Sequence, residues 1–296
     1  MLNKAITCAV LSAAAMTAQA SDTTISYAIT PVMVPEFDLN KGGTADATWM
    51  MASIGVNKQL DAQRSIGVDV SAMRQDWNFN QPVAWGNVNP PWGTLHRWTM
   101  SVPMTYASAS GWLYNISPGV ELSSESGAEN SDSLSYGATA FAAKMFSPSL
   151  LLGLGLSAWT GLEEGELFPF VVVKWKMTDS LTLQNPFHAG PAGPAGLEVS
   201  WQATPALEVA AGGTIRQFTS RLSNTNAVAA NGLLENSSTP LFVRAAYTIS
   251  KEVRFDVYGG AAMGGELTIS DQHNQQVSTE KYDAMPFLAL SLSGRF

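Results

Sequence analysis

The chain ends on the stretch Met285-Pro-Phe-Leu-Ala-Leu-Ser-Leu-Ser-Gly-Arg-Phe296. Leucines occupy every second position from Leu288 to Leu292, and the positions between them are small or polar. Successive side chains of a β-strand point to opposite faces. This period of two therefore predicts a terminal strand with one apolar face and one polar face. The last position is an aromatic residue, Phe296.

A strand that closes on a C-terminal phenylalanine resembles the end of Gram-negative outer-membrane β-barrel proteins. In those proteins this end is the signal read by the barrel-assembly machinery. The resemblance implies an all-β, antiparallel, up-and-down transmembrane barrel with Phe296 as its assembly signal. It points to an uncharacterised barrel family, because the chain does not match the longer strand pattern of trimeric general porins. From this stretch alone, the alternative is the last strand of a secreted soluble β-sandwich.

Residues 1–20 are predicted to be a secretory signal peptide. Lys4 supplies the positive charge, residues 5–15 form an apolar run too short to span a bilayer, and Ala18-Gln19-Ala20 is a small-x-small cleavage site. We expect cleavage after Ala20, secretion to the periplasm and a mature barrel at residues 21–296. The single cysteine, Cys8, lies in the signal, so the mature chain is expected to lack disulfides and thiolate metal sites.

The composition favours a membrane barrel over a soluble domain. Charged residues make up 14% of the chain and apolar residues 46%, whereas roughly a quarter of a soluble domain is charged. The formal net charge of −8 argues against a nucleic-acid partner. The expected partners are outer-membrane lipid and lipopolysaccharide, together with the barrel-assembly machinery at the C-terminal strand. A monomer is expected.

Alternating segments predict about fourteen strands, or about twelve if the weakest pair is lost. The weakest are the first, which contains Pro31 and Pro35, and the short ninth. Short and long gaps alternate, as in barrels with short periplasmic turns and long extracellular loops, so both termini are expected in the periplasm. The expected strands are residues 23–35, 47–59, 64–76, 95–106, 111–124, 133–144, 149–161, 167–177, 180–187, 195–204, 206–221, 240–250, 252–268 and 284–296.

Charged residues fall almost wholly on one face of these strands. We assign that face to the lumen, because Arg or Lys at lipid mid-depth costs about 2–4 kcal/mol. The mixture of signs has two interpretations: a field across a water-filled pore, or ion pairs along the wall. The candidate lumen-lining charges are Asp69, Arg97, Glu121, Lys174, Lys176, Glu198, Glu208, Arg216, Arg244, Arg254 and Asp256.

Aromatic residues cluster near the expected strand ends, where they predict two girdles at the level of the lipid headgroups. On the loop side these are Trp49, Trp77, Trp98, Tyr136, Trp159 and Phe168. The long connections are acidic, and Glu163-Glu164-Gly165-Glu166 is the best candidate for a loop-bound Ca²⁺ or Mg²⁺. It lacks the spaced ladder of a dedicated calcium loop, and solvated loops are the alternative. No other cofactor is expected.

No catalytic motif stands out, and we expect a protein that is not an enzyme. The chain has no GxSxG elbow or HExxH sequence, and none of the three histidines is followed two positions later by serine. The leading hypothesis is a passive channel for small hydrophilic solutes or ions, motivated by a charge-lined inner face with no room for a plug domain. One alternative is a transporter of small hydrophobic molecules, which leave sideways at glycine or proline kinks. It is motivated by the inner-face residues Phe141, Trp159, Phe218 and Phe242. The other is a closed structural or surface barrel.

Overall fold

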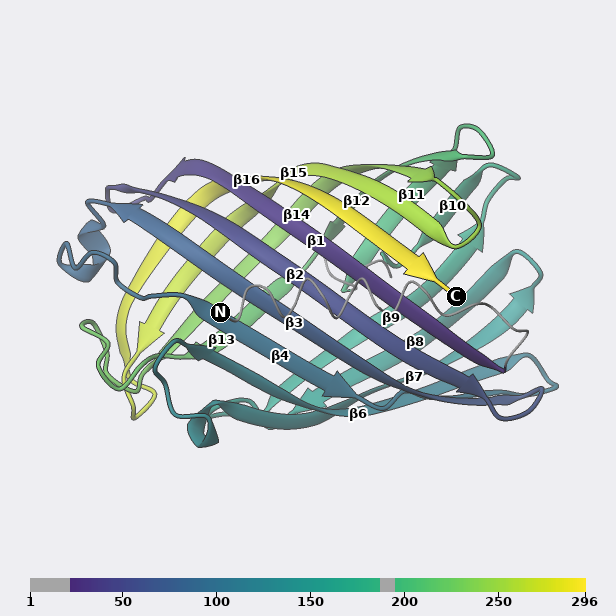
Figure 1. Cartoon of the computed structure of the whole chain (residues 1–296), viewed down its shortest axis with the longest axis horizontal. Helices are drawn as coiled ribbons and strands as arrows, with labels where there is room; N and C mark the ends of the chain where they lie inside the picture. Colours follow the sequence, from purple (N-terminus) through teal and green to yellow (C-terminus); the bar gives the residue numbers. More distant parts are fainter. Residues whose placement is uncertain (1–21, 187–194) are drawn as a thin grey trace.

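A computed structural model describes residues 22–186 and 195–296, which form one antiparallel sheet closed into a barrel (Figure 1). The first and last strands pair with each other, so the sheet has no terminal edge. The sixteen strand segments make fourteen strands, because β4 and β5 are halves of one strand, as are β12 and β13. The segments are β1 Thr23–Asp38, β2 Thr44–Gln59, β3 Arg64–Asn80, β4 Leu95–Ser101, β5 Met104–Ala107, β6 Trp112–Glu125, β7 Leu134–Ser147, β8 Leu150–Trp159, β9 Glu166–Lys176, β10 Leu181–Gln184, β11 Gly196–Gln202, β12 Leu207–Thr214, β13 Arg216–Arg221, β14 Leu233–Thr248, β15 Val253–Ser270 and β16 Gln276–Arg295. The predicted fold class and strand number are confirmed.

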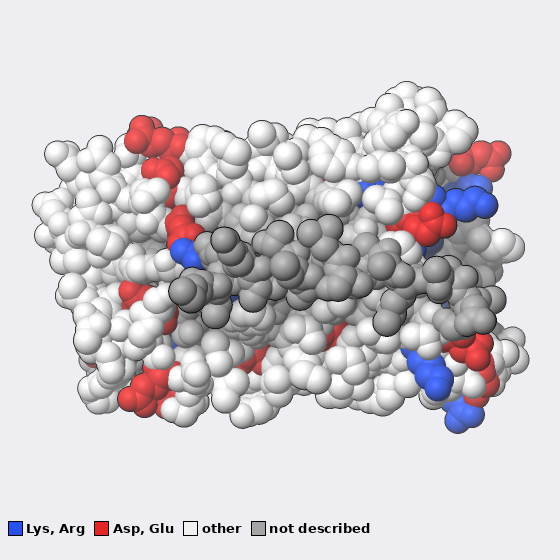
Figure 2. Space-filling model, in the orientation of Figure 1, with Lys and Arg blue, Asp and Glu red and all other residues white. Residues whose placement is uncertain are grey.

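The outer face is apolar, as a lipid-facing wall requires. Val68, Val120 and Val199 are 41%, 38% and 40% exposed, whereas a soluble sandwich would bury them in a dry interior. Figure 2 shows the charged side chains mainly near the two ends of the molecule, with a largely uncharged band between them. Within the described residues, no helix combines the length and the apolar composition that crossing a bilayer requires.

Two predicted long connections are mostly strand. Residues 36–46 were expected to be a loop, but β1 and β2 continue the ladder and leave a turn of residues 39–43. Residues 269–283 likewise reduce to a turn at 271–275 between β15 and β16. The acidic residues led to the wrong boundaries. They alternate with buried inward residues such as Phe37 and Tyr282, so the period of two continues through them.

The wall is pinched at the end that carries the long connections. Up to Ile215 the strand pairs with β11 and β14, whereas the described ladder of β13 runs along β14. Its far end reaches β6, where Arg221 and Ser124 are bridge partners. The side chains of Ser123 and Ser220 hydrogen-bond there at 2.9 Å. Strand β13 therefore crosses the lumen, and the break falls at Ile215.

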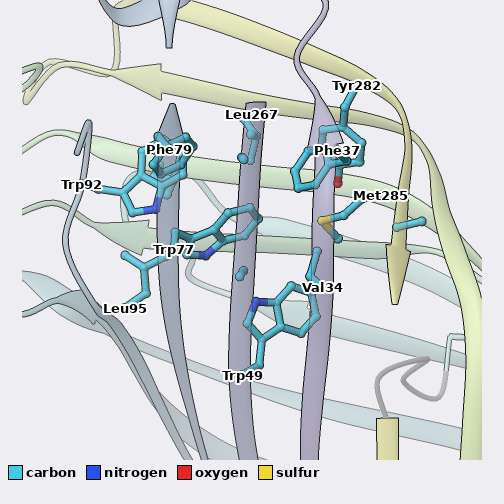
Figure 3. Close-up of a cluster of buried hydrophobic side chains, with 14 of the residues drawn as sticks. Val34, Phe37, Trp49, Trp77, Phe79, Trp92, Leu95, Leu267, Tyr282 and Met285 are labelled. Atoms are coloured by element: carbon cyan, nitrogen blue, oxygen red, sulfur yellow. The ribbon is translucent and has the colours of Figure 1, made fainter. Parts of the chain in front are cut away.

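A cluster of buried apolar side chains fills the loop-side lumen enclosed by β1–β4 and β13–β16 (Figure 3). The Trp77 ring lies at its centre, with centroid distances of 6.2 Å to Trp49, 6.0 Å to Phe79 and 5.9 Å to Trp92. Trp49 and Trp77 are 6% and 7% exposed, so their predicted place in the headgroup girdle is wrong. Both lie on the inward face, in step with the buried Ala47. We call these side chains the aromatic cluster.

Candidate functional site: a cavity at a break in the barrel wall

A cavity of about 600 Å³ lies between β13 and the wall formed by β8 and β9. Ser157, Trp159 and Phe168 line it from β8 and β9, while Gln217 and Thr219 line it from β13. The other face of β13 carries Arg216 and Phe218, which face the aromatic cluster; the Arg216 guanidinium lies over the Trp49 ring. Strand β13 therefore separates the lumen into a packed apolar part and an open part.

Beside this cavity, the ladder between β9 and its neighbour is short among the described residues. Strand β9 pairs with β8 along its length, but it pairs with β10 only from Lys174 to Lys176. Asn185 extends this edge: Val173 N donates to its Oδ1 at 2.9 Å, and its Nδ2 donates to Val171 O at 3.0 Å. Beyond that point, residues 166–170 have no backbone partner on this edge among the described residues.

The cavity reaches the outer surface at this break. Leu167 and Ile215 both line the cavity, although they are 68% and 58% exposed. By register, Leu167 shares the lipid-facing side of β9 with Trp175. Among the described residues, the cavity therefore extends to the outer face of the barrel between β9 and β13.

Glycines allow aromatic rings to lie flat on the inner wall. The Trp159 ring covers Gly137, where an added Cβ would stand 2.4 Å from a ring carbon. The Phe170 ring covers Gly155 in the same way, at 2.1 Å from such a Cβ. Trp159 Nε1 donates to Ser157 Oγ at 3.0 Å, which satisfies its polar atom and fixes the ring. The cavity thus has a rigid aromatic wall.

The carboxylates around the cavity fall into two groups. Glu121 pairs with Arg97 at 2.8 Å, Glu163 pairs with Arg221, and Glu164 Oε1 accepts from the Asn274 amide at 3.0 Å. Two others, Glu166 and Glu235, also line the cavity. Neither has a hydrogen bond or an ion pair to any side chain in the described ranges.

Among the described residues, the predicted cation ligands Glu163, Glu164 and Glu166 are not gathered at one point, and a loop-bound ion there stays a prediction. Each of the first two has its own partner, and Glu166 lies on β9 in register with Trp159. Among the described residues, no three His, Cys, Asp or Glu side chains are arranged to hold a metal ion.

Five of the predicted lumenal charges form one network along the wall. Arg244 Nη2 lies 2.7 Å from Glu198 and 2.9 Å from Glu208, and its Nη1 lies 3.0 Å from Asp256. Arg254 pairs with the same Glu208 and Asp256, at 2.7 and 3.0 Å. Arg244 is fully buried, so its charge is neutralised within the wall.

The other predicted lumenal basic groups do not join that network. Arg97 and Arg216 lie over the Phe218 ring, with guanidinium carbons 4.6 and 4.4 Å from its centroid. Lys176 pairs with Asp179 at 3.3 Å on the turn side. Lys174, its neighbour on the same face of β9, is exposed and in register with Gln184.

Asp69 lies at the opposite end of the lumen from the 600 Å³ cavity. It lines a second cavity of about 580 Å³ near the termini, with Ser26, Arg254 and Arg295 in the same lining. Polar side chains dominate this turn-side end, in contrast to the aromatic cluster.

Comparison with known proteins identifies the family of this chain. Residues 109–293 match the model of a family described as a domain of unknown function, DUF6268. The chain belongs to that family. A search of curated proteins finds no significant match.

Solved structures share the architecture at low sequence identity. The COG4313 outer membrane channel from Pseudomonas putida F1 is 10% identical, with coverage of 94% of this chain and 97% of that one and a TM-score of 0.50. The P. putida toluene transporter TodX is 8% identical, with 94% and 91% coverage and a TM-score of 0.47. The translocator domain of the autotransporter NalP from Neisseria meningitidis is 10% identical, with 100% and 95% coverage and a TM-score of 0.39.

The similarity to the COG4313 channel shows a shared fold. Nothing further is inferred from the two structures with lower TM-scores. The chain is an antiparallel β-barrel with the fold of an outer-membrane channel, in agreement with the prediction from its C-terminal strand. The predicted signal peptide, residues 1–20, lies outside the described residues. The absence of enzymatic activity stays a prediction.

Proposed function

We propose that this barrel is an outer-membrane channel for small molecules with a large apolar surface, which leave the lumen sideways between β9 and β13. The supporting observation is the 600 Å³ cavity that touches both the lumen and the lipid-facing surface through Leu167 and Ile215. An apolar molecule that leaves through such a break enters lipid without crossing the aqueous periplasm. The apolar surface that it carries therefore stays away from water.

The cavity also borders the connection at residues 160–165, on the loop side of the barrel. The start of β1 and the end of β16 lie at the turn side, where barrels of this class face the periplasm. The loop side is thus extracellular, and the route we propose runs from the extracellular rim to the break in the wall.

A straight path for hydrophilic solutes has less support. That hypothesis rested on a charge-lined inner face without a plug. Instead, the aromatic cluster fills the part of the loop-side lumen enclosed by β1–β4 and β13–β16, and five of the predicted lumenal charges neutralise one another along the wall. The polar cavity at Asp69 is the feature that still favours passage of water-soluble molecules.

A closed structural barrel is the second candidate. It is favoured by the packing of the connections at residues 81–94 and 222–232 over the aromatic cluster, where Trp85, Trp92 and Leu222 are buried. The two candidates differ in one measurable property, because a closed barrel passes nothing.

The test is uptake of radiolabelled naphthalene by intact Gram-negative cells that express the barrel, since lipopolysaccharide is the barrier to such molecules. We expect expression to raise the uptake rate several-fold. Gln217→Trp and Thr219→Trp, which place a large ring in the cavity, should abolish the increase. Ala211→Trp is the matched control, because it adds the same ring to the exposed face of β12.

Conductance and arabinose permeation of proteoliposomes complete the test. Steady ion current with arabinose permeation but no naphthalene uptake would restore the hydrophilic-channel hypothesis. Neither current nor uptake would leave the closed barrel.

A further inference from the structure

We propose that the cavity selects molecules that combine an apolar body with a positive charge, such as aromatic amines and quaternary ammonium compounds. This inference deepens the proposed function and rests on it for the passage of the solute, though not for its binding. It follows from the chemistry of the cavity wall, which pairs aromatic rings with carboxylates that have no basic partner among the described residues.

The two carboxylates come from opposite sides of the cavity. Glu166 is the first residue of β9. Glu235 lies on β14, where it is the register partner of Thr219 on β13. Their position on separate strands leaves space between them for an organic cation. The volume of about 600 Å³ falls within the range of roughly 300–1,000 Å³ typical of small-molecule sites.

Most of the nearby basic side chains are paired with carboxylates, and Arg216 lies on the other face of β13, over the Phe218 ring. Of the described residues that line the cavity, Arg97 alone is basic, and its Nη2 lies 2.8 Å from Oε2 of Glu121. Arg221 pairs with Glu163, and Lys281 pairs with Glu266 at 3.2 Å. The cavity therefore keeps net negative charge, which attracts cations and repels anions, as carboxylates do at other pore mouths.

Aromatic rings lie beside these carboxylates. Trp159 is the direct register partner of Glu166, and Phe168 is two residues further along the same face. The face of an indole ring attracts a cation electrostatically, and it also packs against an apolar body. Trp159 is fixed in place by Gly119, Gly137 and Ser157, so this wall is preorganised.

A bare metal ion does not fit the same residues. Among the residues described, no group of three carboxylate, histidine or cysteine side chains converges at one point. A large, weakly hydrated organic cation needs no such convergence, because it satisfies its charge at longer range and buries its carbon atoms against the rings.

The experiment compares phenyltrimethylammonium with tert-butylbenzene, which has the same shape with carbon in place of the charged nitrogen. Each probe is titrated against the purified barrel in phosphatidylcholine nanodiscs, with empty nanodiscs subtracted, and binding is followed by tryptophan fluorescence. We expect the cation to bind about tenfold more tightly at low salt, and this preference to shrink as ionic strength rises.

Charge-removing variants assign the preference to the two carboxylates. Glu166→Gln and Glu235→Gln keep the side-chain size, and each should weaken cation binding about threefold. The double variant should bind both probes equally. Tert-butylbenzene binding should not change. Glu129→Gln, an exposed position in the connection between β6 and β7, removes the same charge away from the cavity and should have no effect.

The outcomes separate this inference from the proposed function. Equal affinity of the two probes in the unmodified barrel, or an intact preference in the double variant, would overturn the selectivity for cations while naphthalene uptake stands. A cation preference in a barrel that takes up no naphthalene would support the binding site and overturn the sideways channel. Failure of both probes to bind would overturn the cavity as a site.

Discussion

The backbone N–H of Ser223 donates to Oε2 of Glu125 at 2.7 Å, which joins two connections that are far apart in the sequence. The same carboxylate accepts from Gly93 N at 2.6 Å and from Asn226 Nδ2 at 3.0 Å. Glu125 is 7% exposed, and no basic side chain in the described ranges pairs with it. Its position at the end of β6 therefore holds the connections at residues 81–94 and 222–232 over the aromatic cluster.

Replacement of Glu125 by alanine is expected to loosen this end of the barrel. The change leaves buried donors without an acceptor, at a cost of about 1–3 kcal/mol for each, so we expect a total loss of roughly 3 kcal/mol. Urea unfolding in detergent micelles measures the loss, and limited proteolysis should cut both connections faster. Glu129→Ala, an exposed neighbour, should change stability by less than about 0.5 kcal/mol. Equal stability of the two variants would show that Glu125 does not hold the connections.

A methyl group at Gly137 is expected to displace the Trp159 ring. The added Cβ would stand 2.4 Å from a ring carbon and 2.5 Å from the Ala158 carbonyl oxygen, so Gly137→Ala should destabilise the barrel by about 1–3 kcal/mol through overpacking. The tryptophan emission should shift as the ring moves. Gly259→Ala is the control, because its added Cβ meets nothing within 4 Å. An unshifted emission in Gly137→Ala would show that the ring does not lie as described.

Loss of the central arginine should unbalance the buried ionic network. Arg244→Met leaves the nearly fully buried Glu198 without its cation and Asp256 with one arginine instead of two, and breaking such a buried pair costs about 3–5 kcal/mol. Urea titration of the refolded barrel measures this cost. The exposed pair of Arg64 and Asp61 provides the comparison, since Arg64→Met should cost less than about 1 kcal/mol. Similar losses for both variants would contradict a buried network.

The alternation of apolar and polar residues was enough to predict the strands and their faces, because a one-residue shift would turn every lipid-facing side chain inward. It did not predict the break at Ile215. The period of two continues unchanged from Val209 through Ile215, and the pinch depends on a contact between Ser123 and Ser220, which are distant in the sequence. A contact between residues so far apart produces no local pattern in the sequence.

The same limit applies to the aromatic residues and the cavity. An aromatic side chain near a strand end suits both a headgroup girdle and a packed lumen, so Trp49 and Trp77 were ambiguous from sequence. Glu235 falls between the strands expected at residues 206–221 and 240–250 and was therefore expected in a loop, whereas it lies on β14 in register with Thr219 and lines the cavity. Its acidic character was visible, but its neighbours were not.

The turn between β15 and β16 is expected to respond to acid. Asp271 lies in this turn, and the backbone N–H groups of Gln275 and His273 hold the pKa of its carboxyl below the usual 3.8. A lowered pKa means that the stabilisation is present above pH 3.8 and is lost as the pH falls through the folded value. Amide exchange at Gln275 should therefore accelerate in that range. Asp271→Asn should abolish the pH dependence, and an unchanged profile in this variant would assign the effect to another group.

Phe296 lies at the seam between β1 and β16, where its ring packs against a neighbouring strand and where it is the proposed assembly signal. Its ring stacks on Tyr27 with centroids 5.8 Å apart, and its backbone exchanges two hydrogen bonds with Ile25 at 2.8 and 2.9 Å. Phe296→Ala and Tyr27→Ala remove the same ring contact and keep the backbone bonds. If Phe296 is read by the assembly machinery, Phe296→Ala should lower the amount of folded barrel in the outer membrane several-fold, while Tyr27→Ala has little effect. Equal losses in quantified outer-membrane fractions would show that the stacking contact, and not recognition of the terminal residue, is what matters at this seam.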